Sequence, residues 1–207
     1  TALSAAATLV EQIRRIGGGR PCLVVAHSMG GAVATAAAEA APELFAGLVY
    51  VSAYAPVSGL PAAAYAMSQE NAGVRMDGLL KADPRKIGGL RIDTGDVSQH
   101  DQIREAFYND LDADTATAAI SLLSTDAPAG IAATAFEVTK ACYGAIPHAY
   151  VMSARDNMVR PALQRRLIKE IDAVSARPTV VTELDSSHSP FLSQPGALAG
   201  FIVSLDL

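Results

Sequence analysis

Ser28 stands in a five-residue pattern that is typical of a nucleophilic serine. The segment 26–30 reads Ala-His-Ser-Met-Gly, with a small residue two positions before and two positions after the serine. It follows the apolar run 22–26 and precedes an Ala-rich stretch, which predicts a sharp turn between a buried strand and a helix. Such a turn needs small neighbours and lifts the serine oxygen above the sheet edge. The alternative is an ordinary strand-to-helix turn with a serine at the helix start.

A serine hydroxyl needs a positioned imidazole to take its proton at neutral pH. Of four histidines, we expect His188 to be this base, because it lies in the loop after the last predicted strand, where functional groups gather in open α/β sheets. His27 adjoins Ser28 and points away from it, which predicts packing or hydrogen bonding at the pocket wall. His100 lies in a polar stretch that favours the surface. His148 precedes a strand and favours bonds to local backbone.

Asp156 is the predicted acid that orients His188, because it directly follows the third predicted strand and precedes the histidine. Asp185 remains an alternative, although it lies close to His188 on the same loop. Asp172 near a helix end and Asp126 in the middle of the chain are weaker candidates. At the serine turn, the backbone N–H of Met29 is the predicted donor to an oxyanion, since it opens the following helix.

The hydrophobic pattern alternates between strands and helices. Apolar runs typical of buried strands occur at 22–26, 48–51, 149–152 and 179–182. Helical patterns occur at 4–16, 28–41, 161–171 and 196–205. This alternation predicts an α/β fold with a doubly wound, mostly parallel sheet.

Residues 57–146 break this alternation. Helical patterns occur there at 102–108, 113–123 and 131–141, and no strand is expected. A long helical insertion between two sheet strands predicts a cap over the site. The expected organisation is one domain, formed by 1–56 and 147–207, with the cap inserted at 57–146.

Composition limits the classes of partner. Lys and Arg number 16 against 21 Asp and Glu, a net charge of −5, without the basic patch that nucleic acid binding requires. No apolar run approaches the roughly 20 residues that span a bilayer. We therefore expect neither nucleic acid nor membrane as a partner, while a homodimer stays open. Cys22 and Cys142 favour reduced structural thiols and thus a cytoplasmic location, although an upstream targeting segment stays open.

Four stretches resemble the α/β-hydrolase superfamily: LVVAHSMGGAVA around Ser28, FYNDLDADTA in the insertion, IPHAYVMSARDNMVRPALQRRLI around Asp156 and ELDSSHSPFLSQP around His188. They are most similar to the branch that contains plant salicylate methylesterases, hydroxynitrile lyases and bacterial esterases. The resemblance implies an enzyme without cofactor or metal that cleaves a small carboxylic ester under a helical cap. Ser28, Asp156 and His188 each fall on the matching motif position, so the resemblance implies a triad that works through an acyl-enzyme.

Two features depart from that branch. Its hydroxynitrile lyases carry a Lys directly after the catalytic His, whereas this chain has Ser189, which favours ester hydrolysis over cyanohydrin cleavage. Members of the family also begin with strands and an HG-type oxyanion loop upstream of the helix with which this chain opens. We therefore expect the N-terminal strands and the second oxyanion donor to be missing from this sequence. This expectation supports a second hypothesis, a truncated or non-catalytic scaffold that acts as a binding protein.

Apolar and aromatic residues near the predicted triad are candidates to line the substrate pocket, although each equally suits an ordinary core position. The predicted substrate contacts are His27, Tyr54, Met158 and Phe191, with Phe107 and Tyr108 as further lining candidates. The sequence does not identify the ester.

Overall fold

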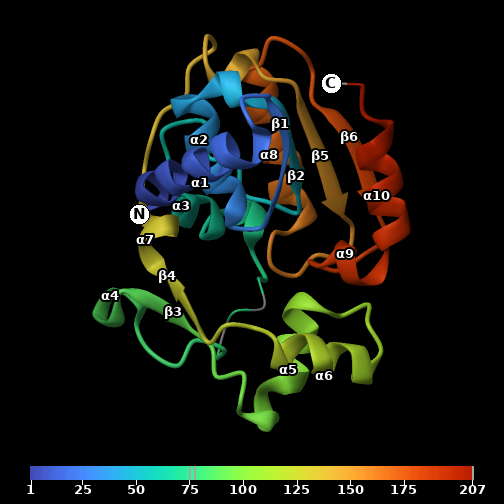
Figure 1. Cartoon of the computed structure of the whole chain (residues 1–207). Coiled ribbons are helices and arrows are strands. Elements are labelled where there is room, and N and C mark those ends of the chain that lie inside the picture. Colours follow the sequence, from blue (N-terminus) through green and yellow to red (C-terminus); the bar gives the residue numbers. More distant parts are fainter. Residues whose placement is uncertain (75, 77, 207) are drawn as a thin grey trace.

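A four-stranded parallel sheet forms the centre of the protein (Figure 1). The computed structural model describes residues 1–74, 76 and 78–206. The strands follow the order β1-β2-β5-β6 and every neighbouring pair is parallel. Their bounds are β1 Cys22–His27, β2 Phe45–Val51, β5 His148–Ser153 and β6 Val180–Leu184. Each overlaps a predicted apolar run, and the predicted α/β fold with a mostly parallel sheet is confirmed.

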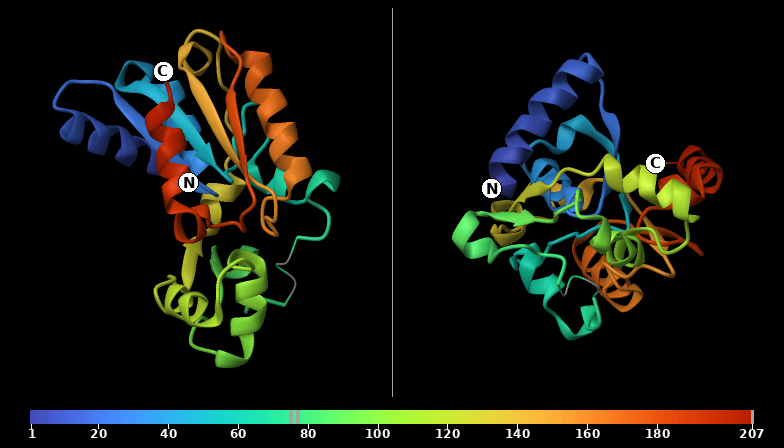
Figure 2. Two further views of the ribbon diagram at one scale, coloured as in Figure 1. Left: turned by 90° about the vertical axis from the view of Figure 1, so that its right-hand side faces the viewer. Right: turned by 90° about the horizontal axis from the view of Figure 1, so that it is seen from below.

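Helices cover both faces of this sheet (Figure 2). Because side chains alternate across a strand, Leu48 and Tyr50 of β2 pack into the cluster beneath α1, α2 and α8, whereas Val49 and Val51 pack against Leu198 of α10. The bounds are α1 Ala2–Gly17, α2 Gly30–Ala40, α8 Pro161–Val174, α9 Pro190–Ser193 and α10 Pro195–Ser204. No helix in the described part of the chain is long and apolar enough to cross a membrane.

The middle of the segment 57–146 forms a lobe below the carboxyl ends of the strands (Figures 1 and 2), whereas the two ends of the segment pack on the core. The lobe has an apolar cluster of its own around Leu79, Ile103 and Ile120. The elements of the lobe are α4 Pro84–Ile87, β3 Gly89–Arg91, α5 His100–Phe107, α6 Ala113–Ser121 and β4 Asp126–Pro128. At the two ends of the segment, α3 Ala62–Ala66 and α7 Ala129–Ala133 lie against the core.

Two expectations for the segment 57–146 were wrong. We expected no strand, but β3 and β4 pair antiparallel, with Arg91 bound to Asp126 at 2.6 Å; three-residue strands that lie 35 positions apart leave no periodic signal. We also expected a helix over 131–141, but α7 ends at Ala133. Beyond it, the Glu39 carboxylate accepts the backbone N–H groups of Thr139 and Tyr143, which holds this stretch in a non-helical course.

The close approach of α2 to the chain after β2 depends on one glycine. A Cβ atom at Gly31 would lie 2.1 Å from the carbonyl oxygen of Tyr54 and 2.9 Å from Cβ of Ala53. At the preceding position, Gly30, a Cβ atom would meet nothing within 4 Å. The small residues in this part of the sequence therefore differ in importance, and only Gly31 is required by packing.

His148 lies buried in β5 and not before it, as the sequence had suggested. Its Nδ1 lies 3.1 Å from the Ser175 hydroxyl, and the same hydroxyl lies 2.8 Å from the carbonyl oxygen of Ile171. Nε2 is buried and has no hydrogen-bond partner in the described part of the chain. Burial lowers the pKa of His148 to about 4, although Asp172 partly opposes this shift.

Both cysteines are free thiols, and Cys22 packs against the central core.

We predict that Gly31→Ala lowers the free energy of unfolding by about 1–3 kcal/mol, the usual cost of overpacking, because the new methyl group meets fixed backbone. Gly30→Ala is the matched control and is expected to raise stability by up to about 1 kcal/mol, since alanine favours the helix. Urea unfolding followed by circular dichroism measures both. Equal effects of the two substitutions would contradict the packing argument.

The pKa of His148 predicts a pH dependence of stability. Between about pH 6.5 and its folded pKa of about 4, the unfolded chain binds more protons, so the free energy of unfolding falls as the pH falls through this window. Its contribution between pH 7 and pH 5 is about 2 kcal/mol. The variant His148→Leu is expected to flatten the profile by this amount in urea titrations across the pH range, and an unchanged slope would refute the assignment.

Candidate active site

Ser28 forms the turn between β1 and α2. Its φ angle of 52° lies in the left-handed region, which is strained for a residue with a side chain. Neighbouring backbone holds it there: Ser28 N donates to Val51 O at 3.3 Å, and Tyr54 N donates to Ser28 O at 3.0 Å. The helix begins two residues later, at Gly30, rather than at the serine. The predicted sharp turn is thus present in the structure.

Three side chains meet at the carboxyl ends of β1, β5 and β6. His188 Nε2 lies 2.8 Å from Ser28 Oγ, and His188 Nδ1 lies 2.9 Å from Asp156 Oδ2. His188 and Asp156 are each 1% exposed. The structure therefore brings together the three residues that the sequence singled out as nucleophile, base and acid, in one hydrogen-bonded line.

The Asp156 carboxylate is oriented by the backbone that follows it. Its Oδ1 atom accepts the N–H groups of Met158 at 2.7 Å and Val159 at 2.9 Å. With Oδ1 occupied in this way, Oδ2 faces His188. These bonds make the acid a fixed acceptor for the Nδ1–H proton of the imidazole.

The other candidate acids are engaged elsewhere. The side chain of Asp185 is 79% exposed and forms an ion pair with Arg155 at 2.9 Å. Asp172 accepts from the backbone and hydroxyl of Thr179. Asp126 pairs with its β3 neighbour on the exposed side of the lobe. Of these four aspartates, Asp156 is the one whose carboxylate bonds to the His188 ring.

His27 contacts the back of the candidate base. Its Nε2 lies 2.7 Å from the backbone oxygen of His188, and its ring contacts those of His188 and Phe191, with centroids at 4.6 and 4.9 Å. Burial and the neighbouring His188 lower the pKa of His27 to about 3. His27 is thus neutral near pH 7 and donates its Nε2–H to the His188 carbonyl. The sequence predicted packing or hydrogen bonding for His27, but not that its partner would be the backbone of His188.

The candidate substrate contacts lie in different surroundings. Tyr54 is 6% exposed, and burial together with the nearby Asp156 carboxylate raises the pKa of its hydroxyl. Met158 packs against the apolar cluster of the inserted lobe, and Phe191 is 43% exposed. Phe107 lies with its ring centroid 5.9 Å from that of His188. Tyr108 is buried in the core of the lobe, and His100 bonds to the carbonyl of Thr94 away from the triad.

Three buried serines beneath the triad were missed from the sequence. The Ser52 and Ser153 hydroxyls lie 2.6 Å apart, and the Ser186 hydroxyl donates to that of Ser153 at 3.0 Å. They link the ends of β2, β5 and β6, and Ser52 is itself left-handed, with φ 46°. The available signal was a serine at or just after each strand end.

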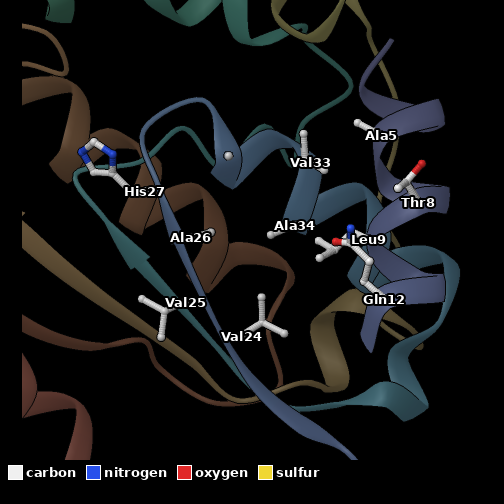
Figure 3. A pocket seen from close by; sticks show the side chains of 11 residues that line it. Ala5, Thr8, Leu9, Gln12, Val24, Val25, Ala26, His27, Val33 and Ala34 are labelled. Atoms are coloured by element: carbon white, nitrogen blue, oxygen red, sulfur yellow. The ribbon is translucent and has the colours of Figure 1, made fainter. Parts of the chain in front are cut away.

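Two clefts adjoin this region. One, of about 530 Å³, runs along β1 between α1 and α2 and reaches His27 at one end (Figure 3). The other, of about 470 Å³, is polar and lies between α5 and the loop that carries Asp156. Among the described residues, no group of three or more His, Cys, Asp or Glu side chains is placed to hold a metal ion.

Known proteins share this sequence pattern and fold. The chain is 27% identical over 186 residues to a pyrethroid hydrolase of Sphingobium wenxiniae, covering 86% of this chain, and spans 60% of that protein's length. It is 30% identical over 195 residues to methylesterase 18 of Arabidopsis thaliana, covering 87% of this chain and 69% of the relative.

Solved structures share the overall fold of this chain. A pyrethroid hydrolase from Sphingobium faniae superposes with a TM-score of 0.74 at 25% identity, covering 88% of this chain and 69% of that one. Polyneuridine aldehyde esterase superposes with a TM-score of 0.74 at 18% identity, covering 96% and 76%. The sequence profile of the alpha/beta hydrolase family matches residues 1–201. The chain therefore belongs to the alpha/beta hydrolase family.

Proposed function

We propose that this protein is a carboxylic-ester hydrolase that works through an acyl-enzyme on Ser28. The observation that carries the proposal is the continuous line of hydrogen bonds from Ser28 through His188 to Asp156. In addition, the two curated relatives described above are named a pyrethroid hydrolase and a methylesterase. Both names suit an ester substrate here.

In the first half-reaction, Ser28 Oγ attacks the ester carbonyl while His188 Nε2 takes its proton. Asp156 accepts from Nδ1–H, which fixes the tautomer with a free Nε2 and stabilises the imidazolium that forms. The Met29 N–H donates to no acceptor in the described part of the chain and stands at the start of α2, where it would bind the oxyanion. Collapse of the tetrahedral intermediate breaks the ester C–O bond, and His188 returns the proton to the leaving alcohol.

In the second half-reaction, His188 activates a water that attacks the acyl carbon, and Ser28 Oγ leaves and regains its proton. The product acid then departs. No cofactor enters either step. Residues 57–146 would act as the cap, since Phe107 of this segment lies against His188 and Met158 of the core packs against the segment's apolar cluster.

The proposed substrate is a small ester with an apolar part. Tyr54, Met158 and Phe191, with Phe107 of the cap, supply apolar and aromatic surface near the triad. Ser189 stands where the related lyases carry Lys, which disfavours cyanohydrin cleavage. A purely ligand-binding scaffold would have no need for a fully hydrogen-bonded triad.

We predict that a fluorophosphonate adds once per molecule, at Ser28, and that Ser28→Ala removes both the adduct and ester turnover. Turnover of p-nitrophenyl butyrate should fall by at least about 10⁴-fold, as for other triad serines. Intact mass and initial rates measure the two effects, with Ser204→Ala, an exposed serine of α10, as the control. A wild-type protein without adduct or turnover would favour the binding scaffold, and cyanide release from mandelonitrile would favour a lyase.

The two aspartates near His188 provide a second test. Asp156→Asn keeps the size of the side chain but forces the wrong imidazole tautomer, so kcat should fall about 10⁴-fold. Asp185→Asn is the matched variant and should change kcat by no more than about twofold, because exposed ion pairs contribute little. Steady-state kinetics distinguish them, and the reverse ranking would make Asp185 the acid.

A further inference from the structure

The loop that carries the candidate base and the loop that carries the acid are both bonded to one turn of the inserted lobe. This turn, residues 107–110 at the carboxyl end of α5, is here called the bridging turn. It lies 46 positions from Arg155 and about 80 from Ser187 in the sequence. Its side chains and carbonyl groups bond to the residues directly before His188 and Asp156, and these bonds can fix the positions of both.

On the base side, the bridging turn holds Ser187, the residue directly before His188. Ser187 N donates to Asp110 Oδ2 at 2.9 Å, and the Ser187 hydroxyl donates to the Phe107 carbonyl at 3.1 Å. Ser187 is fully buried, so water does not compete for these groups. A bond from a backbone N–H to a carboxylate is charge-assisted and short. The main chain at His188 is thus fixed on both sides, by Asp110 through Ser187 and by His27 at its carbonyl.

On the acid side, the same turn holds Arg155, the residue directly before Asp156. The Asn109 side chain donates to the Arg155 carbonyl at 3.0 Å, and the Asn157 side chain donates back to the Glu105 carbonyl of α5 at 2.8 Å. Residues on either side of the acid are therefore attached to one helix end. The polar cleft behind Asp156 is lined by these groups.

The Asp110 carboxylate is partly buried, and burial of a charged group lowers stability unless hydrogen bonds compensate. The Ser187 and Ser193 side chains stabilise it. Burial raises the pKa of Asp110, but hydrogen bonding from Ser187 and Ser193 outweighs it, and the pKa lies below its usual value. The carboxylate is thus ionised at neutral pH. Part of the compensation comes from the base loop, since one carboxylate oxygen accepts the Ser187 N–H.

We propose that Asp110 is a positioning residue: its carboxylate holds Ser187 and thereby places His188 between Ser28 and Asp156. This inference rests on the proposed hydrolase function. It assigns to the inserted lobe a part in aligning the triad in addition to covering the site. Since misplacement of a reacting group by about 1 Å costs on the order of 100-fold in rate, loss of this one bond should affect turnover more than folding.

The test compares Asp110→Ala and Asp110→Asn with Asp112→Ala. Asp112 lies two residues further on and caps α6 through Thr115, without a hydrogen bond or ion pair to either triad loop in the described part of the chain. Active sites are first titrated with a fluorophosphonate, so that kcat is expressed per reactive serine. Asp110→Ala should lower kcat by at least about tenfold with KM changed much less. Asp110→Asn, which retains an acceptor oxygen, should recover part of this loss, and Asp112→Ala should keep the wild-type kcat.

A second measurement does not depend on turnover. The Nδ1–H proton of His188, bonded to Asp156, gives a low-field proton NMR signal, which should shift or broaden in Asp110→Ala and stay unchanged in Asp112→Ala. Asn109→Ala should have a weaker effect on both readouts, because Met158 and Val159 also hold the Asp156 carboxylate.

The outcomes separate the two proposals. If Asp110→Ala only lowers the melting temperature, as Asp112→Ala does, and leaves kcat per site and the His188 signal unchanged, Asp110 is not a positioning residue, although the hydrolase proposal stands. If the wild-type protein neither reacts with the fluorophosphonate nor cleaves esters, the hydrolase proposal fails. In that case, a shifted His188 signal in Asp110→Ala alone still supports the placement of His188 by Asp110.

Discussion

The left-handed backbone of Ser28, at φ 52°, is the constraint on which the carboxyl end of the sheet depends. This conformation costs a residue with a side chain on the order of 1–2 kcal/mol, and it persists only where the surroundings fix it. Here, bonds to Val51 and Tyr54 tie both sides of the turn to the chain at and beyond the end of β2. The same closeness leaves no room for a Cβ atom at Gly31. The strained backbone of Ser28, the glycine at position 31 and the parallel pairing of β1 with β2 therefore all follow from the close approach of this turn to the chain after β2.

Once the serine oxygen is fixed, the other groups must be brought to it, and the structure does this mainly through the backbone. Both ring nitrogens of His188 are hydrogen-bonded, to Ser28 and Asp156. Its main chain is held by His27 at the carbonyl oxygen and by Asp110 through the preceding residue, Ser187. Asp156 is held by two backbone N–H groups. A site whose donors and acceptors are already oriented needs little reorganisation when charge develops, which is the physical basis for the proposed chemistry.

The parts of this arrangement that could be predicted are those with a local signal. Continuous apolar runs located all four strands, although only β2 and β5 are buried on both faces, and β1 and β6 expose side chains at the edges of the sheet. The turn at Ser28 needs small residues at fixed positions. Both signals lie within a few residues, and the order Ser28, Asp156, His188 follows from the order of the strands. The bond from Glu39 to Thr139 joins residues 100 positions apart, and that from Ser187 to Asp110 joins residues 77 apart. Such bonds leave no periodicity, so the short β3–β4 pair, the early end of α7 and the bridging turn were missed.

The bridging turn also limits how the inserted lobe can vary. Phe107, whose ring faces His188, belongs to the same turn that bonds to both triad loops, so a change that reshapes the pocket there also disturbs the alignment of the triad. The β3–β4 pair is built differently: it is held by the exposed ion pair of Arg91 and Asp126 and contacts α4 and α7. Substitutions in that pair can alter the outer surface of the lobe without reaching the base or the acid. We therefore expect substitutions in the β3–β4 pair to be tolerated more readily than substitutions in the turn beside His188.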